Sequence, residues 1–122
     1  MGAKKILAAD DSLSLRQVVK LVLTEAGYEV VEAVDGKDAL TKLGNTPMNL
    51  IMTDLNMPNL DGVGFIKAVR ANPVHRLTPI LMVTTESADE KKQAGKSAGA
   101  TGWVVKPFSP DQLLAVVKKL IR

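Results

Sequence analysis

The sequence contains no cysteine, which excludes disulfides, thiolate nucleophiles and zinc sites with cysteine ligands. Aromatic residues make up only 3% of the chain, so it lacks a set of stacking platforms for single-stranded nucleic acid. No apolar run approaches the length of a membrane span, and the apolar stretch near the N-terminus is too short for a signal peptide. We therefore expect a cytoplasmic monomer that binds neither nucleic acid nor membrane.

The charge balance and composition are those of an ordinary globular domain. The 16 basic and 13 acidic residues give a formal charge of +3, spread along the chain without a long basic run. Hydrophobic residues account for 46% of the 122 positions, enough for one core. We find no repeat, linker or low-complexity tract, so we expect residues 1–122 to form one domain without an attached effector domain.

Short apolar runs alternate with amphipathic helical segments along the whole chain. The runs read as buried parallel strands, each followed by a helix, at residues 5–9, 29–33, 50–53, 80–83 and 103–105. Five such strand–helix repeats with short connections predict an α/β fold, a doubly wound parallel sheet covered by helices on both faces.

The first and the fourth helical segments differ in composition. In the first, the apolar residues predict an inward face, and Gly27 follows as a terminator; these residues are Leu15, Val18, Val19, Val22 and Ala26. The fourth segment, residues 88–98, is polar and contains Gly95, which costs about 0.5–1 kcal/mol relative to alanine inside a helix. We predict that this fourth helix is the least stable and most mobile of the five.

Polar residues suited to metal and phosphate chemistry stand where four of these runs end. They are Asp10 and Asp11, Asp54, Thr84, and Lys106. Ligands of open parallel sheets bind beyond the carboxyl ends of the strands, so these side chains should meet at one edge. A hard divalent ion such as Mg²⁺ takes oxygen ligands of this kind, whereas singly each aspartate would more simply cap a following helix. We expect Lys106 to pair with Asp54 at rest.

Four motifs resemble the receiver domain of bacterial response regulators. They are Asp10-Asp11, Thr-Asp-Leu-Asn-Met-Pro-Asn-Leu-Asp-Gly around Asp54, Val83-Thr84-Thr85-Glu86, and Lys106-Pro107-Phe108. The resemblance spans the chain and is strongest to the single-domain chemotaxis type, the CheY-like receivers. It implies a flavodoxin/CheY-like (βα)5 fold with strand order 2-1-3-4-5.

The resemblance also implies a role for each site residue. Asp54 would be the phosphoacceptor, forming a 4-aspartylphosphate with a phosphoryl group from a kinase phosphohistidine. Asp11, Asp54 and the backbone carbonyl of Asn56 would ligate Mg²⁺ directly, and Asp10 through a water. Lys106 would neutralise the phosphoryl group, and its bond to Pro107 would be cis.

Signalling would pass from the phosphoryl group to a surface. By resemblance, Thr84 moves toward the phosphoryl group and Trp103, at a position usually held by tyrosine or phenylalanine, turns inward. Asn56 and Glu86 would tune the loss of the phosphoryl group. A basic patch with an aromatic centre would bind an acidic peptide through Lys91, Lys96, Trp103, Lys118 and Lys119.

The partners implied are a CheA-like histidine kinase, a flagellar motor switch protein or other acidic target, and a phosphatase.

A phosphorelay or kinase-modulating receiver with a non-motor partner is the main alternative. A phosphatase of the haloacid dehalogenase type would need an aspartate where Asn56 stands, and a cap that this chain lacks. A non-phosphorylated adaptor with a vestigial site is the remaining alternative. We expect a switch that only gains and loses its own phosphoryl group, not an enzyme with a separate substrate.

Overall fold

The structure is a computed structural model that describes residues 2–85 and 89–121. Strands and helices alternate as predicted, with one short 3-10 helix, η1. Their bounds are β1 Lys5–Ala9, α1 Leu13–Glu25, β2 Glu29–Ala33, α2 Gly36–Leu43, β3 Leu50–Asp54, α3 Gly62–Ala71, η1 Pro73–His75, β4 Ile80–Thr85, α4 Asp89–Ala98, β5 Gly102–Lys106 and α5 Pro110–Leu120. The site residues Asp54, Thr84 and Lys106 are thus within the ends of their strands rather than just beyond them.

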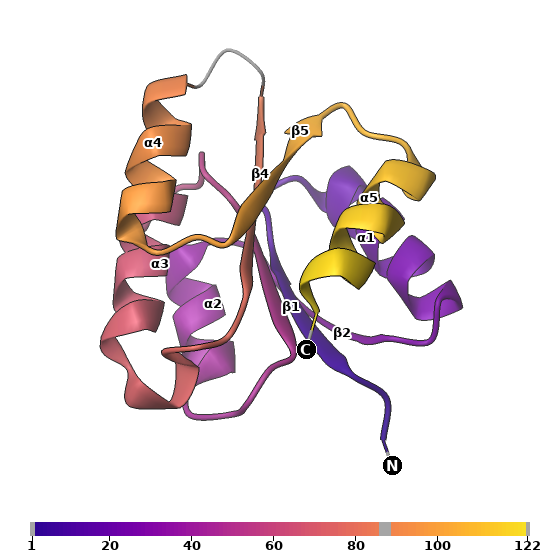
Figure 1. Cartoon of the computed structure of the whole chain (residues 1–122), viewed down its shortest axis with the longest axis horizontal. Coiled ribbons are helices and arrows are strands. Elements are labelled where there is room, and N and C mark those ends of the chain that lie inside the picture. Colours follow the sequence, from indigo (N-terminus) through magenta and orange to yellow (C-terminus); the bar gives the residue numbers. More distant parts are fainter. Residues whose placement is uncertain (1, 86–88, 122) are drawn as a thin grey trace.

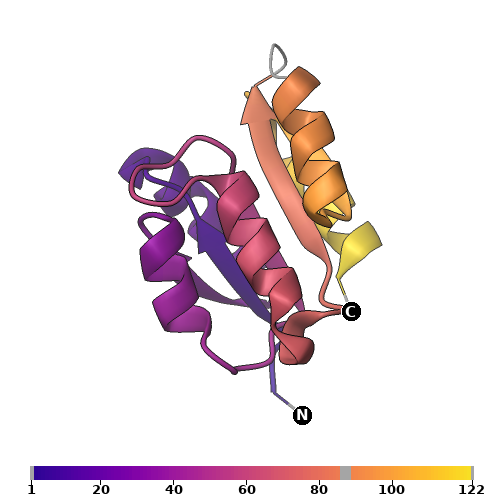
Figure 2. The same cartoon turned by 90° about the vertical axis from the view of Figure 1, so that its left-hand side faces the viewer.

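All strand pairs are parallel, and the order across the sheet is β2-β1-β3-β4-β5. The predicted doubly wound, CheY-like sheet of order 2-1-3-4-5 is therefore confirmed. Helices α1 and α5 cover one face, while α2, α3 and α4 lie side by side on the other (Figures 1 and 2). The switch in winding direction falls between β1 and β3, which places the ends of these two strands at the crevice where such sheets bind ligands.

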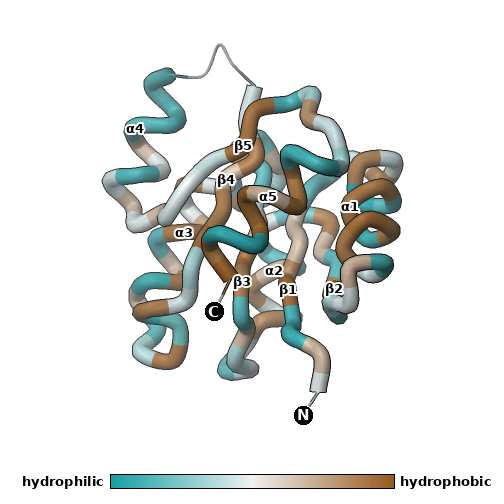
Figure 3. The backbone as a smooth tube through the Cα atoms, turned by 45° about the vertical axis from the view of Figure 1, so that its right-hand side comes forward, coloured by the Kyte–Doolittle hydropathy of each residue, from teal (hydrophilic) through white to brown (hydrophobic). Residues whose placement is uncertain are grey.

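Each face of the sheet carries its own hydrophobic core. The core under α2 and α3 centres on Phe65 and Ile66, and the core under α1 and α5 on Leu23 and Leu113, all four fully buried. All five residues of β3 are buried, since this strand is covered on both sides. The apolar character of β3 and β4 is visible along the backbone in Figure 3, where α4 is mostly hydrophilic or neutral. Four methionines are buried: Met48, Met52, Met57 and Met82.

Helices on the ligand-binding edge begin at side-chain caps. Ser12, Asp35 and Asp61 accept hydrogen bonds from the first turns of α1, α2 and α3, satisfying amides that otherwise lack partners. At the start of α3, Gly62 lies against the end of β3, where a Cβ atom would fall 2.2 Å from the Asp54 carbonyl oxygen. This close approach, which only glycine allows, holds the loop after β3 against the strand that carries Asp54.

The inward face predicted for α1 was wrong in part. Val18 is 48% exposed and Ala26 is exposed as well, whereas the buried residues of this helix are Arg16, Val19 and Leu23. A spacing of three and four residues puts these three on one stripe, and Val18 lies well off it. Because Arg16 is charged, the apolar pattern of the sequence did not include it in the buried stripe, and the predicted face was rotated away from the observed one.

Helix α4 begins at Asp89, and Ala88, the first residue predicted for it, lies outside the described residues. Gly95, treated above only as a weak point, is buried against β4. A Cβ atom at this position would lie 2.0 Å from Met82 Sδ, so the glycine lets the helix approach the sheet. Among the described residues, no helix is long and apolar enough to cross a membrane.

Candidate functional site

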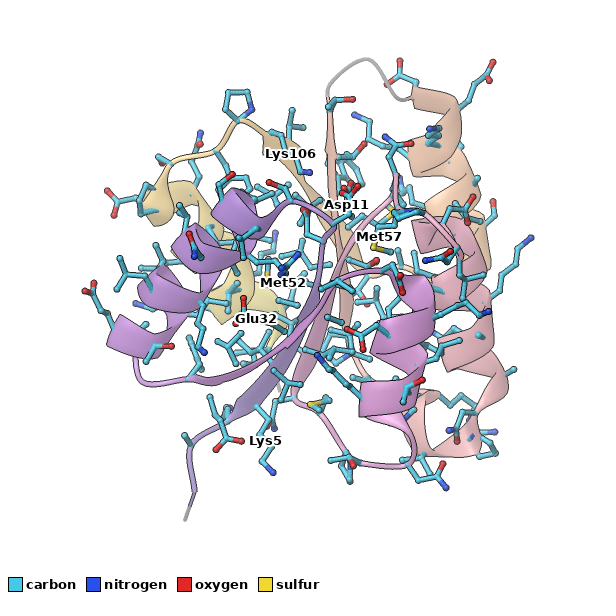
Figure 4. All side chains as sticks on the ribbon, turned by 180° about the vertical axis from the view of Figure 1, so that it is seen from behind. Lys5, Asp11, Glu32, Met52, Met57 and Lys106 are labelled. Atoms are coloured by element: carbon cyan, nitrogen blue, oxygen red, sulfur yellow. The ribbon has the colours of Figure 1, made fainter. Side chains whose placement is uncertain are left out.

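Three carboxylates meet at the carboxyl edge of the sheet. Asp10 and Asp11 follow β1, and Asp54 ends β3; one carboxylate oxygen from each lies within 4.8 Å of the others. Asp10 and Asp54 are buried, whereas Asp11 is exposed. Figure 4 shows Asp11, Met57 and Lys106 near this end of the sheet and Lys5 at the opposite end. The topology thus assembles the predicted acidic cluster.

Backbone amides hold the two buried carboxylates in place. The amide of Ser12 donates to Asp10 Oδ1 at 2.9 Å, and the amide of Asn56 donates to Asp54 Oδ1 at 3.2 Å. Each aspartate thus accepts a hydrogen bond from the backbone amide of the residue two positions later, at the start of the loop that follows its strand. The cluster is oriented by the backbone before any ligand arrives.

Lys106 supplies the counter-charge. Its Nζ lies 3.3 Å from Asp54 Oδ2, which confirms the predicted pairing, and 3.1 Å from Asp10 Oδ2, a second pairing that the sequence did not predict. The side chain extends from the end of β5, the edge strand of the sheet, toward the carboxylates of Asp10, which follows β1, and Asp54, which ends β3. The Lys106–Pro107 bond is cis, as the resemblance implied.

The charges of the site perturb one another. Burial raises the pKa of Asp54, and the neighbouring Asp10 charge raises it further; Lys106 and the Asn56 amide oppose this without reversing it. Burial alone would lower the pKa of Lys106, but Asp10 and Asp54 outweigh it and raise that pKa. A carboxylate that is costly to keep charged, beside a firmly held ammonium, suits a site that receives further negative charge together with a cation.

The residues fit a hard divalent cation. Three clustered carboxylates repel one another, and oxygen-only donors of this kind are preferred by Mg²⁺ and Ca²⁺. The exposure of Asp11 leaves a way in for such an ion.

Thr84 is 1% exposed, and its hydroxyl donates to the Thr85 carbonyl at 3.2 Å. The sequence predicted Thr84 at the same edge of the sheet. Thr84 does lie near the end of β4, beside β3, where Val83 pairs with Asp54. Its hydroxyl bonds the backbone of the next residue and is not among the described groups that bond Asp54.

Trp103 lies on the outer strand with its side chain outward, 41% exposed. Two lysines of α4 approach the face of its ring: Lys96 Nζ is 4.6 Å from the ring centroid and Lys92 Nζ is 5.6 Å away. Such cation–π contacts contribute about 0.5–1 kcal/mol when exposed. A cleft of about 430 Å³ adjoins Trp103 between β5 and α5, with Pro107, Gln112 and Val116 among its lining residues.

The lysines that contact Trp103 differ in part from those of the predicted basic patch. Lys91 points to the site, where its Nζ donates to the side-chain carbonyl of Asn56, and Lys92, which was not predicted, stands beside Trp103. Lys118 and Lys119 are exposed, and Lys119 lines a separate pocket with Leu77 and Thr101. Glu86, expected to tune the phosphoryl lifetime, lies outside the described residues.

A family model for the response regulator receiver domain matches residues 6–118. The chain belongs to this family. A structure of the chemotaxis protein CheY4 from Vibrio cholerae is similar over 98% of this chain and 99% of its own, with 50% identity and a TM-score of 0.92. Receiver domains act as phosphorylation-dependent switches in two-component signalling, and that is the general function of this chain.

Curated relatives differ in length. A probable transcriptional regulator, ycf27, of Cyanophora paradoxa is 40% identical over the whole chain, which spans 50% of that protein. Protein PilG of Pseudomonas aeruginosa is 33% identical over 93% of this chain and 84% of its own length. The receiver therefore occurs among the relatives both as most of a protein and as half of a longer one.

Proposed function

We propose that Asp54 is the phosphoacceptor of this receiver and forms a 4-aspartylphosphate. The observation that carries the proposal is the buried Asp54 carboxylate at the end of β3, with Lys106 Nζ 3.3 Å from one oxygen and the Asn56 amide on the other. A carboxylate fixed in this way can act as a nucleophile, and Lys106 is already in place to pair with the negative charge of the phosphorylated product.

In the forward step, an Asp54 oxygen attacks the phosphorus of a phosphohistidine on the donor kinase. A new P–O bond forms, the P–N bond breaks, and the imidazole leaves with the bonding pair. Because phosphoryl transfer passes through a loose transition state, positioning and charge neutralisation provide most of the catalysis. Lys106 provides one positive charge for the phosphoryl oxygens. In dephosphorylation, water attacks phosphorus and the bond between phosphorus and the Asp54 oxygen breaks, which releases phosphate and restores the carboxylate.

We assign Asp10, Asp11, Asp54 and the backbone carbonyl of Asn56 to a Mg²⁺ site, with Asp10 acting through a water. The hard oxygen donors of the cluster support this assignment. When bound, the ion would offset the charge that gathers on the phosphoryl oxygens. The protein's own part is to hold the carboxylates in register through the amides of Ser12 and Asn56.

The output would run through Thr84 and Trp103 to the α4-β5-α5 surface. The Thr84 hydroxyl would exchange its bond to the Thr85 carbonyl for one to the phosphoryl group, and Trp103 would leave the lysines of α4 to turn inward. A partner with acidic side chains suits the surface that carries Lys92 and Lys96. Asn56, with Lys91 on its side chain, and Glu86 would tune the lifetime of the phosphoryl group.

We further propose a chemotaxis role, with a CheA-like kinase as donor, a phosphatase, and a flagellar motor switch protein as target. The 50% identity to Vibrio cholerae CheY4 over nearly the full length of both chains favours this role over a phosphorelay or kinase-modulating receiver. We also propose that residues 1–122 act as a single domain, a cytoplasmic monomer that has no separate substrate.

Phosphorylation from a small donor tests the proposal. The protein is incubated with acetyl phosphate in Mg²⁺ or in chelator, and intact mass is recorded alongside the variants Asp54→Asn and Asp111→Asn. We expect one phosphoryl group on the wild type and on Asp111→Asn, whose carboxylate is exposed on α5, and none on Asp54→Asn or without Mg²⁺. Failure of the wild type to gain mass would favour the vestigial adaptor, and steady turnover of phosphate esters would favour the phosphatase.

A further inference from the structure

Arg16 is a buried cation directly behind the acidic cluster. Its side chain extends from α1, is 10% exposed, and donates from Nη1 to the backbone carbonyl of Asp10 at 2.6 Å. On its other side, Nε lies 3.7 Å from Glu32 Oε1 at the neighbouring strand β2, which runs beside α1 (Figure 4). Arg16 therefore connects α1, β2 and the backbone of the acidic pair Asp10-Asp11.

The bond to Asp10 is well placed to fix the geometry of that backbone. Its donor is charged and its surroundings are buried, conditions under which hydrogen bonds are short and strong. The Asp10 amide also donates to the Ala33 carbonyl at 3.1 Å, so both backbone polar groups of Asp10 are held. Because the peptide planes on both sides of the Asp10 Cα are held, the direction of the Asp10 side chain is fixed, and so is the peptide that leads into Asp11.

Glu32 partly offsets the charge of Arg16, 3.7 Å from its Nε, so the effect of Arg16 on the cluster is mainly geometric. Lys20 shares the same carboxylate, 3.5 Å from the other Glu32 oxygen. A bare cation so close to three carboxylates would weaken binding of Mg²⁺, whereas a neutralised one chiefly positions the carbonyl. Groups that orient metal ligands in this way typically contribute about 10–100-fold to metal affinity.

We propose that Arg16 is a positioning residue for the metal site: by holding the Asp10 carbonyl it orients Asp10 and Asp11 and so sets the affinity for Mg²⁺. This inference rests on the metal site proposed above. If Arg16 had a purely structural role, tying α1 to β2 through Glu32, its loss would lower the stability of every form of the protein and leave the affinity for Mg²⁺ unchanged.

Calorimetric titration with MgCl₂ separates the two roles. We expect Arg16→Met to weaken Mg²⁺ binding by about tenfold, and Arg16→Lys, which keeps a donor, to recover most of that loss. The matched control is Lys20→Met, which removes the other ion pair of Glu32 and leaves the Asp10 carbonyl untouched; it should bind as the wild type does. Amide shifts of Asp10 and Asp11 in metal-free Arg16→Met should move more than those in Lys20→Met.

The outcomes distinguish the inference from the proposed function. A wild type that does not bind Mg²⁺ overturns the metal site itself. A wild type that binds, together with an Arg16→Met variant that binds equally well but melts earlier, overturns the positioning role alone. If Arg16→Met does not fold, Glu32→Gln, which frees the guanidinium from its anchor, decides. A several-fold loss of Mg²⁺ affinity together with moved amide shifts of Asp10 and Asp11 supports the inference, whereas unchanged affinity, or a loss with unmoved shifts that comes from the unpaired charge alone, contradicts it.

Discussion

At the scale of single residues, the site is a balance of three carboxylates against one ammonium. The repulsion affects Asp54 most clearly: its burial and the neighbouring charge of Asp10 both raise its pKa. Lys106 bridges the two buried carboxylates and is itself held charged by them. The site is thus destabilised at rest in a way that a bound cation would relieve.

The raised pKa of Asp54 predicts a pH-dependent effect of Asp54→Asn on stability. An unfolded aspartate has a pKa near 3.8, and the folded value is higher, so the charged form opposes folding at neutral pH and the protonated form does not. In chelator we expect Asp54→Asn to raise the melting temperature by about 2–5 °C at pH 7 and to have no such effect below pH 3.8. Calorimetry at both values checks this; equal gains at both would contradict the electrostatic cause.

Lys106→Arg is expected to separate phosphorylation from output. A planar guanidinium keeps the charge but does not reproduce a compact ammonium that reaches Asp10 and Asp54 together. The variant should still gain one phosphoryl group from acetyl phosphate, and its Trp103 fluorescence should no longer respond. Lys118→Arg, on the exposed side of α5, is the control and should respond as the wild type does. A full fluorescence response in Lys106→Arg would count against its role.

Residue types at strand ends were enough to predict most of the site. Asp10, Asp11, Asp54 and Lys106 come together because parallel strands bring their carboxyl ends to one edge, a rule that needs no coordinates. Arg16 and Lys92 were not predicted, since each depends on which way a helix is rotated. The partner of Lys91 likewise depends on how α4 packs beside the loop after β3.

At the scale of elements, α4 contacts both the acidic site and the surface around Trp103 that we propose for output. Lys91 contacts Asn56 at the site, and Lys92 and Lys96 contact Trp103 on β5. Of its described residues only Gly95 is buried, so the helix is attached to the sheet through one close backbone approach and a few polar contacts. An element held in this way can shift at low cost.

Gly95→Ala tests that attachment. Helix propensity favours alanine by about 0.8–1.0 kcal/mol, but the added Cβ would meet Met82 Sδ, and overpacking of this kind costs about 1–3 kcal/mol. We expect the variant to lose stability in urea denaturation. In a Met82→Ala background the collision is absent, so the same substitution should be neutral or stabilising there. A loss of equal size in both backgrounds would exclude contact with Met82 as the cause.

Hydrogen exchange is expected to rank α4 below the other helices. It offers a single buried residue, whereas α3, its neighbour on the same face, buries Gly62, Phe65, Ile66 and Val69. Amides of residues 93–98 should exchange sooner than those of 65–71 under native conditions. Equal protection in the two helices would refute the prediction that α4 is the mobile one.

The order of elements followed from the sequence more readily than their orientation. Buried parallel strands are continuous apolar runs, and their alternation with helices leaves few topologies. The face of α1 was predicted incorrectly because Arg16 stands among the buried positions of its stripe and Val18 does not. The packing reason for Gly95 was invisible for a similar cause, since it lies in the contact with Met82 and not in the helix itself.

At the scale of the whole molecule, the sheet connects a reactive edge to an exposed reporter. Asp54 ends the central strand β3, Thr84 lies on β4, and Trp103 stands on β5, so the three occupy successive strands. Trp103 is the only tryptophan of the chain and lies outward against two lysines. A change at Asp54 that draws the Thr84 hydroxyl toward it and turns Trp103 inward would therefore change the fluorescence of Trp103.

The most direct test of this account is a beryllofluoride titration, with and without Mg²⁺, that follows Trp103 fluorescence and backbone amide shifts together. Beryllofluoride binds a carboxylate as a phosphoryl group does, so the titration examines the site without a kinase. We predict saturable binding that needs Mg²⁺, is absent in Asp54→Asn, and moves the resonances of Thr84, Trp103 and α4. The absence of binding by both probes in the wild type, or undiminished binding in Asp54→Asn, would contradict the account.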